Sequence, residues 1–228
     1  MYKPDIRLTK SGVPVLSKKE IDVIGEKLVG EFSPQALVTP QEFDIDLFVQ
    51  DYLGMEQDFQ YLTHCGMYLG MTVFEDTDKV PVFDPVNGRA DYISAKAHTV
   101  IIDRTLLENG QEQRYRFTMG HEAGHEILHQ QYFTHIPMVR CRVDYGKADN
   151  RASGAWTDTD WMEWQANELS AAVLMPMSMV HAVAREVRES GVEECLFDYT
   201  LVGRVAEVFQ VSLEAASYRL MHLGYLSK

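Results

Sequence analysis

The hydrophobic pattern of this chain changes its period twice, and the order of those changes restricts the possible folds most strongly. Before residue 67 and after residue 111, apolar residues recur at helical spacing. Between these regions, short runs rich in valine, isoleucine and phenylalanine predict strands at 71–76, 79–84 and 98–103. Helices, a short sheet and then helices again are the order of an α+β fold. We therefore expect a mostly helical α+β fold with a small three-stranded, largely antiparallel sheet.

Cap and stop residues mark the expected helices. Ser17 opens an apolar stripe over 17–32, and Thr39 followed by Pro40 opens another over 38–55. The remaining helices are expected within 57–66 and at 112–131, 159–174, 176–190 and 198–223. The polar segment 134–160 is expected to be a long loop, which in a compact domain often borders a functional cleft.

Composition and charge exclude several classes of protein. The net charge of −13 and the pI near 5.0 give a surface that repels a phosphate backbone, so we expect no direct contact with nucleic acid. Cys65, Cys141 and Cys195 form no CxxC pair, which argues against a disulfide framework or a cysteine zinc site. The first residues lack the apolar core of a signal peptide, and no apolar run reaches the roughly 18 residues that cross a bilayer, so neither is expected. A cytoplasmic protein without a membrane partner is expected; the sequence leaves its oligomeric state open.

The run MGHEAGHEILH, residues 119–129, carries residues with metal chemistry. His121 and His125 are four residues apart and share one face of the expected helix, where two imidazoles bind one Zn²⁺ at about 2.0–2.1 Å. Glu122 directly follows the first histidine and is placed to act as a general base on an attacking water. Gly124 lacks a side chain, so another element is able to approach closely. Two histidines do not complete a zinc site, and a third protein ligand is required.

His129 lies one further turn along the same face, but it is a poor third ligand. Ligands at three successive turns lie in line and do not close a tetrahedron. In the metzincin pattern the third histidine comes about ten positions after the first. His129 comes too early for that pattern, so we expect it to support a ligand or to belong to the core.

The segment WMEWQANELSAAVLMP, residues 161–176, offers a better third ligand. Glu163 and Asn167 are four residues apart and share a helix face. Glu163 is the expected carboxylate of a His₂Glu zinc site of the gluzincin class, and Asn167 is the expected acceptor for a ligating imidazole. Glu168, the rival carboxylate, lies off this face and is expected to be solvated. The expected centre therefore joins the HEAGH segment to Glu163 across two helices.

Two blocks of the sequence together resemble a known family. RFTMGHEAGHEILH (116–129) and EWQANELSAAVLMP (163–176) are similar to the paired motifs of the ImmA/IrrE family of HExxH metallo-endopeptidases. Within the blocks, Leu169 and Ser170 replace the usual Phe-Ala pair of that family. The resemblance implies a zinc cofactor, three metal ligands and one base, at His121, His125, Glu163 and Glu122.

The resemblance covers about residues 40–226 and also implies a substrate. Members of the family cut helix-turn-helix transcriptional repressors of mobile elements or stress regulons, so the implied partner is a DNA-binding repressor. The acidic surface fits a basic partner of this kind. We expect an N-terminal helical extension over 1–37 and a metallopeptidase domain over 38–228, whose last helices occupy 198–226.

Two other classes of function remain open at this stage. The helix pair over 201–223 has the outline of a helix-turn-helix DNA-binding motif, with Arg219 and His222 as the positive groups of its second helix. A zinc-stabilised sensor or interaction module would keep the metal without catalysis, although such a module has no use for the base Glu122.

Substrate placement and the oxyanion donor are the least determined parts of the site. The strand at 98–103 is the expected edge of the sheet, along which a substrate would lie antiparallel and form main-chain hydrogen bonds. The sequence does not choose among five candidate oxyanion donors, which are Tyr115, Tyr132, Tyr145, His129 and His135.

Overall fold

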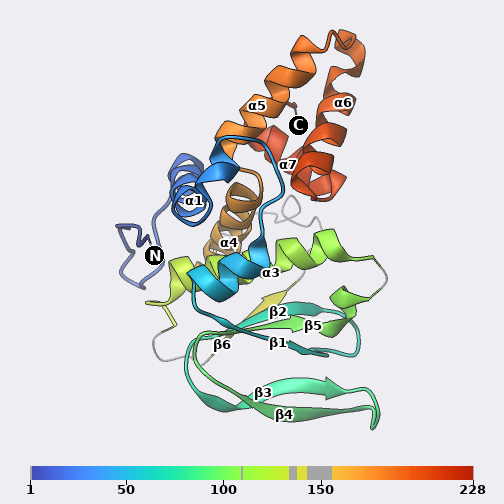
Figure 1. Cartoon of the computed structure of the whole chain (residues 1–228). Helices are drawn as coiled ribbons and strands as arrows, with labels where there is room; N and C mark the ends of the chain where they lie inside the picture. The colour runs from blue at the N-terminus through green and yellow to red at the C-terminus, as the bar shows by residue number, and fades with distance from the viewer. Residues whose placement is uncertain (1, 109, 134–137, 143–155, 228) are drawn as a thin grey trace.

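The chain places its helices on one side of a mixed β-sheet and a β-ribbon on the other side (Figure 1). The computed structural model describes residues 2–108, 110–133, 138–142 and 156–227. The α-helices within these residues are α1 (Lys18–Phe32), α2 (Ile45–Leu47), α3 (Glu112–His129), α4 (Asp158–Leu174), α5 (Met177–Glu189), α6 (Glu194–Phe209) and α7 (Leu213–His222). The strands are β1 (Glu56–Gln60), β2 (Tyr68–Val73), β3 (Thr77–Asp84), β4 (Arg89–Ala95), β5 (Thr99–Asp103) and β6 (Met138–Arg142). Short 3₁₀ or π turns occur at Pro34–Leu37, Phe48–Tyr52 and Arg104–Leu107.

The α+β class is confirmed, and the strands are arranged differently from the expected three-stranded sheet. The main sheet has the order β1-β5-β2-β6, with β1 parallel to β5 and the other pairs antiparallel. The predicted strand at 79–84 lies in β3, which pairs with β4 in the separate ribbon. The helix predicted within 57–66 is wrong, because this segment begins with the end of β1. Its sequence EQDFQ has no β-branched residue, so the pairing with β5 determines its conformation rather than local propensity.

The sheet separates two apolar cores, and the alternation along β5 shows how. Val100 and Ile102 belong to the larger core, which the helices cover. Ile101, between them, belongs to a smaller core beneath the sheet, together with Met71 of β2 and Val80 of the ribbon. A strand that is buried on both faces reads as a continuous apolar run, which is why the sequence predicted this one correctly.

Local caps explain where the N-terminal helices begin. The predicted Ser17 cap is confirmed: its hydroxyl accepts from the backbone N–H of Glu20, and the Glu20 carboxylate accepts from the N–H of Ser17. The predicted start at Thr39 is wrong. Asp44 caps α2 instead, with its carboxylate accepting from the N–H of Leu47 at 3.0 Å, so the helical segment starts five residues later.

The predicted long loop at 134–160 contains β6 and the first turn of α4, while 134–137 and 143–155 lie outside the described residues. Thr157 caps α4 through a capping box with Asp160.

Cys65 and Cys195 are exposed free thiols. Among the described residues, no helix combines the length and the apolarity that crossing a membrane requires.

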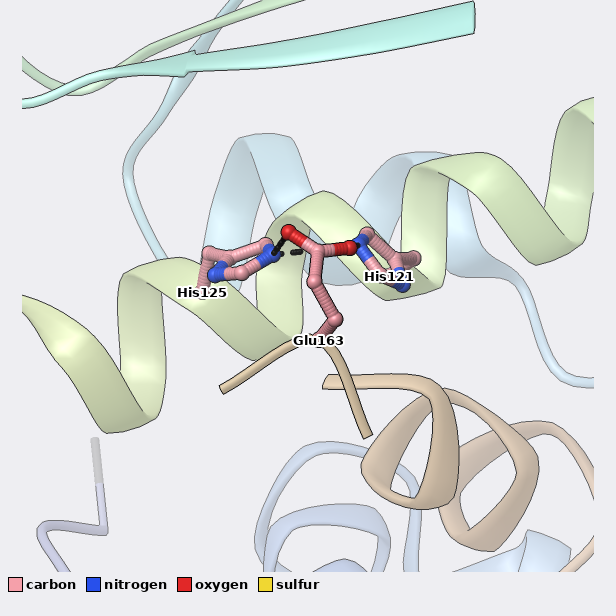
Figure 2. A group of neighbouring side chains, drawn as sticks. All are labelled: His121, His125 and Glu163. Carbon is pink, nitrogen blue, oxygen red and sulfur yellow. Dashed lines mark hydrogen bonds and ion pairs between the residues drawn. The ribbon is translucent and has the colours of Figure 1, made fainter. Parts of the chain in front are cut away.

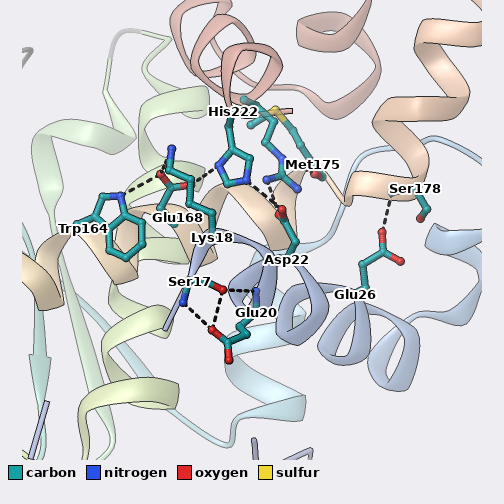
Figure 3. A network of polar contacts seen from close by, with 11 residues as sticks. Ser17, Lys18, Glu20, Asp22, Glu26, Trp164, Glu168, Met175, Ser178 and His222 are labelled. Carbon is teal, nitrogen blue, oxygen red and sulfur yellow. Dashed lines mark hydrogen bonds and ion pairs between the residues drawn. The ribbon is translucent and has the colours of Figure 1, made fainter. Parts of the chain in front are cut away.

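A buried ionic network joins α7 to α1 and α4 (Figure 3). His222 lies between two carboxylates, with Nε2 at 2.9 Å from Asp22 and Nδ1 at 2.7 Å from Glu168. Arg219 donates to Asp22 at 2.6 Å and to the carbonyl of Met175 at 3.0 Å. Each buried charge therefore has an opposite partner, as burial requires.

This network removes the basis of the DNA-binding alternative. The two positive groups that the second helix of the pair would present to a phosphate backbone are Arg219, which is only 2% exposed, and His222, which is enclosed by carboxylates. A side chain neutralised in the interior of the protein does not contact DNA. The helix pair α6 and α7 instead packs against the helical core.

The network also predicts how stability depends on pH. Hydrogen bonds to Asp22 and Glu168 raise the pKa of His222 above its ordinary value of 6.5. Its contribution to stability is therefore complete below pH 6.5 and is lost as the pH rises through the raised value. Burial would raise the pKa values of Asp22 and Glu168, but their contacts with His222 outweigh burial and lower both pKa values. The stability that these two carboxylates contribute is therefore lost only as the pH falls through the lowered pKa values.

We expect His222→Asn to lower the free energy of unfolding by about 2 kcal/mol at pH 6, because two charge-assisted hydrogen bonds are weakened. The loss should shrink as the pH rises through the raised pKa of His222. Denaturant unfolding between pH 6 and 9 measures this change. His181→Asn is the matched control, since His181 bonds a tyrosine hydroxyl, and its loss should not follow the same pH course. Parallel pH profiles of wild type and His222→Asn would contradict the assignment.

Candidate metal centre

The candidate site depends on a very close approach of α3 to α4. A Cβ at Gly124 would lie 3.0 Å from the Cα of Ala166 and 3.1 Å from its carbonyl oxygen, both on the backbone of α4. One turn earlier, a Cβ at Gly120 would meet the hydroxyl of Ser170 at 2.5 Å. The prediction that Gly124 allows another element to approach is therefore confirmed. Ser170, one of the two departures from the family motif, donates its hydroxyl to the carbonyl of Phe117 on α3 at 3.0 Å.

At this crossing the side chains of His121, His125 and Glu163 converge (Figure 2). The two Nε2 atoms of the histidines are 3.0 Å apart. Glu163 reaches from α4 between the rings, with Oε2 at 3.3 Å from Nε2 of His121 and Oε1 at 3.5 Å from Nε2 of His125. Both histidines are almost completely buried, whereas the Glu163 side chain is 26% exposed.

The donor set fits a tetrahedral cation. Ligand atoms about 2.0–2.1 Å from a tetrahedral Zn²⁺ lie about 3.3–3.4 Å from one another. The three separations of 3.0, 3.3 and 3.5 Å are close to that edge length. The ring nitrogens that face away from the cluster have other partners. Nδ1 of His121 lies 2.8 Å from Oδ1 of Asn167, and Nδ1 of His125 lies 3.0 Å from Nδ1 of His129. Only Nε2 of each ring points toward the shared centre.

Burial and charge set the protonation of these groups. Burial would raise the pKa of Glu163, but its close contacts with the two histidine rings outweigh burial and lower the pKa. Burial lowers the pKa of His125, and it lowers the pKa of His129 to about 3. An ionised carboxylate and neutral imidazoles are the forms that bind a metal.

Glu122 lies on a face of α3 next to that of the two histidines, and its carboxylate packs against β2. It is fully buried, and its Oε2 accepts from the hydroxyl of Thr72 at 2.6 Å. Its carboxylate occupies the space that a Cβ at Gly70 would fill, so β2 must have glycine at that position for Glu122 to fit. Sequence reasoning missed Thr72 and Gly70, because a strand threonine and a strand glycine carry no motif of their own.

The structure also places the rival carboxylate and three of the five candidate oxyanion donors. The prediction that Glu168 is solvated is wrong, because its carboxylate accepts from His222 and forms an ion pair with Lys18. His129 is fully buried behind His125. The phenol of Tyr115 donates to Asp46. Of the other candidate oxyanion donors, Tyr132 lies just after the C-terminus of α3, while Tyr145 and His135 lie outside the described residues.

The expected substrate-binding edge at 98–103 is wrong. This segment is β5, which lies between β1 and β2 and pairs with both. Its apolar run reflects burial on both faces rather than an edge position. Among the described residues, the outer strands of the main sheet are β1 and β6.

Comparison with known proteins agrees with this geometry. The IrrE N-terminal-like domain, peptidase family M78, matches residues 69–221. The match spans more than half of the chain, which therefore belongs to this family. Membership implies a peptidase of the metallopeptidase type that acts on a protein substrate. No curated protein was found to match the chain at a significant level. The matched region contains the whole cluster of His121, His125 and Glu163.

The close helix crossing gives a testable prediction. We expect Gly124→Ala to lower the free energy of unfolding by about 1–3 kcal/mol, because a methyl group against the α4 backbone forces the helices apart. Gly203→Ala is the matched control: Gly203 is also helical, but a Cβ there meets nothing within 4 Å. That variant should be neutral or more stable by about 0.5–1 kcal/mol. Denaturant unfolding measures both, and equal effects would show that the crossing tolerates a wider separation.

Proposed function

We propose that the chain is a zinc-dependent endopeptidase in which His121, His125 and Glu163 hold the ion. The convergence of two Nε2 atoms and one ionised carboxylate at tetrahedral spacing is the observation that carries this proposal. Two histidines and one glutamate form the donor set of catalytic zinc sites, which leave one coordination position open for reaction. Asn167 accepts from Nδ1 of His121 and so orients that ring.

Catalysis requires a base as well as the ion, and we assign that role to Glu122. When bound, zinc acts as a Lewis acid toward the scissile carbonyl and the attacking water. Glu122 accepts a proton from that water and passes it to the leaving amine nitrogen as the peptide bond breaks. Thr72 donates to one carboxylate oxygen of Glu122 and so fixes its orientation. A zinc-stabilised sensor would need no such carboxylate beside its histidines.

The proposed substrate is a helix-turn-helix transcriptional repressor. This assignment rests on the resemblance of the two motif blocks to the ImmA/IrrE family and on charge. A DNA-binding repressor carries a basic surface, and the net charge of −13 attracts such a partner over distance. We further propose zinc rather than another divalent ion, because imidazole with a single carboxylate is a borderline donor set that suits zinc better than magnesium or calcium.

The ligand assignment distinguishes the two neighbouring glutamates of α4. We expect Glu163→Gln to weaken zinc binding roughly 100-fold or more, since loss of a ligand exceeds the effect of a supporting residue. Glu168→Gln, an isosteric change five residues away, should leave zinc affinity unchanged. Competition with a chromophoric chelator measures both affinities. Stoichiometric, tightly bound zinc in Glu163→Gln would show that another residue is the third ligand.

The catalytic assignment predicts a variant that binds zinc without cutting. We expect Glu122→Gln to retain zinc and to slow cleavage about 10²- to 10⁴-fold, because only proton transfer is removed. The assay is co-expression with a helix-turn-helix repressor encoded beside the gene, followed by mass spectrometry of the fragments. Glu112→Gln, at the exposed start of α3, is the control and should cut normally. Normal cleavage by Glu122→Gln would exclude the general-base role, and zinc-loaded wild type that releases no fragment would favour the sensor module.

A further inference from the structure

The protein holds a chain of hydrogen bonds behind His125 that the proposed catalysis does not use. We propose that Gln165 is a positioning residue that, acting through His129, keeps the proton of His125 on Nδ1. This inference rests on the proposed metal site, where Nε2 of His125 must offer a lone pair. It concerns the ligand-free protein, because the position of the proton is set before any ion binds.

The direction of the chain follows from its far end. The backbone carbonyl of Pro14 only accepts hydrogen bonds, so the Gln165 side chain must present its NH₂ group there, at 2.7 Å. That choice leaves Oε1 of Gln165 facing His129, at 3.0 Å from Nε2. An amide oxygen also only accepts, and therefore Nε2 of His129 carries a proton.

The protonation of His129 then determines that of His125. A neutral imidazole with a proton on Nε2 has a lone pair on Nδ1, so His129 accepts on that atom. The nearest donor is Nδ1 of His125 at 3.0 Å. His125 consequently donates from Nδ1 and keeps Nε2 unprotonated, pointing at His121 and Glu163. Every group of this relay (Pro14 carbonyl, Gln165, His129 and His125) has a single consistent role.

The relay matters because Glu163 attracts the proton in the opposite direction. Its ionised carboxylate lies 3.5 Å from Nε2 of His125, and a proton on that nitrogen would form a hydrogen bond to it. A proton there would occupy the lone pair that binds metal. Without the relay, the ligand-free site would therefore favour the tautomer of His125 that cannot bind zinc.

The anchor of the relay lies outside the region that matches the family. Pro14 is in the N-terminal segment, 151 positions before Gln165, where it forms a β-bridge with Leu8. The neighbouring Val13 is buried against Phe133 and Met162, which holds the segment on the ends of α3 and α4. The matched region begins only at residue 69, so a part of the proposed N-terminal extension supports a ligand of the catalytic domain.

The positions of the protons are directly measurable. Two-bond ¹H–¹⁵N correlation spectra of ligand-free, ¹⁵N-histidine-labelled protein show which ring nitrogen carries each proton. We expect Nδ1–H for His125 and Nε2–H for His129 in the wild type. Finding the proton of His125 on Nε2 would overturn the proposal without any variant. In Gln165→Met we expect it to shift toward Nε2, and a wild-type spectrum for that variant would equally overturn the proposal.

Zinc affinity provides a second and independent readout. We expect Gln165→Met to weaken zinc binding about 10- to 100-fold, the usual effect of a residue that orients a ligating histidine. Gln57→Met is the matched control, because Gln57 also donates to a backbone carbonyl, that of Asp46, at 3.0 Å and away from the site. That control should leave zinc affinity and the histidine spectrum unchanged.

A double-mutant cycle separates the relay from simple packing. Because Gln165 acts through His129, adding Gln165→Met to His129→Phe should cause no further loss of zinc affinity. Additive losses would show that Gln165 only fills space, and would overturn the proposal. Failure of the proposed function gives a different result: a wild type that binds no zinc would still show the predicted protons on His125 and His129.

Discussion

The close crossing of α3 and α4 is the constraint on which the rest of the site depends. On α3, Gly120 and Gly124 have no side chain, and on α4 the facing residues Ala166 and Ser170 have small ones. The backbones can then approach until Glu163 reaches between the two histidines of α3. A larger residue at any of these positions would increase the ligand separations, which already match the edge of a tetrahedron around one ion.

Much of this arrangement was predictable because its information is local. A histidine pair four residues apart and a glutamate with an amide four residues later are patterns read along a single helix. The predicted helices at 112–131 and 159–174 agree with α3 and α4 to within two residues. The structure then places Glu163 and Asn167 beside His121, as the spacing implied.

The errors and omissions concern interactions between distant segments. β1 has the composition of a polar helix or loop, and only its parallel pairing with β5 makes it a strand. Glu168 reads as a surface residue until His222, 54 positions later, packs against it. Pairing with a segment far along the chain leaves no periodic signal in the sequence. The role of Gln165 was not predicted for the same reason, because its partner Pro14 is 151 positions away.

The wide separation of these partners also sets an order of assembly. As the chain leaves the ribosome, Pro14 emerges first, the histidines of α3 follow, and Gln165 emerges with α4 much later. Until α4 has crossed α3, the two histidines lack the carboxylate of Glu163, His121 lacks Asn167, and His125 lacks the Gln165 end of the proposed relay. Contacts of such long range form late in folding. A nascent chain therefore exposes a histidine pair without the carboxylate of the proposed zinc site, and on that proposal metal uptake is one of the last steps in the maturation of the protein.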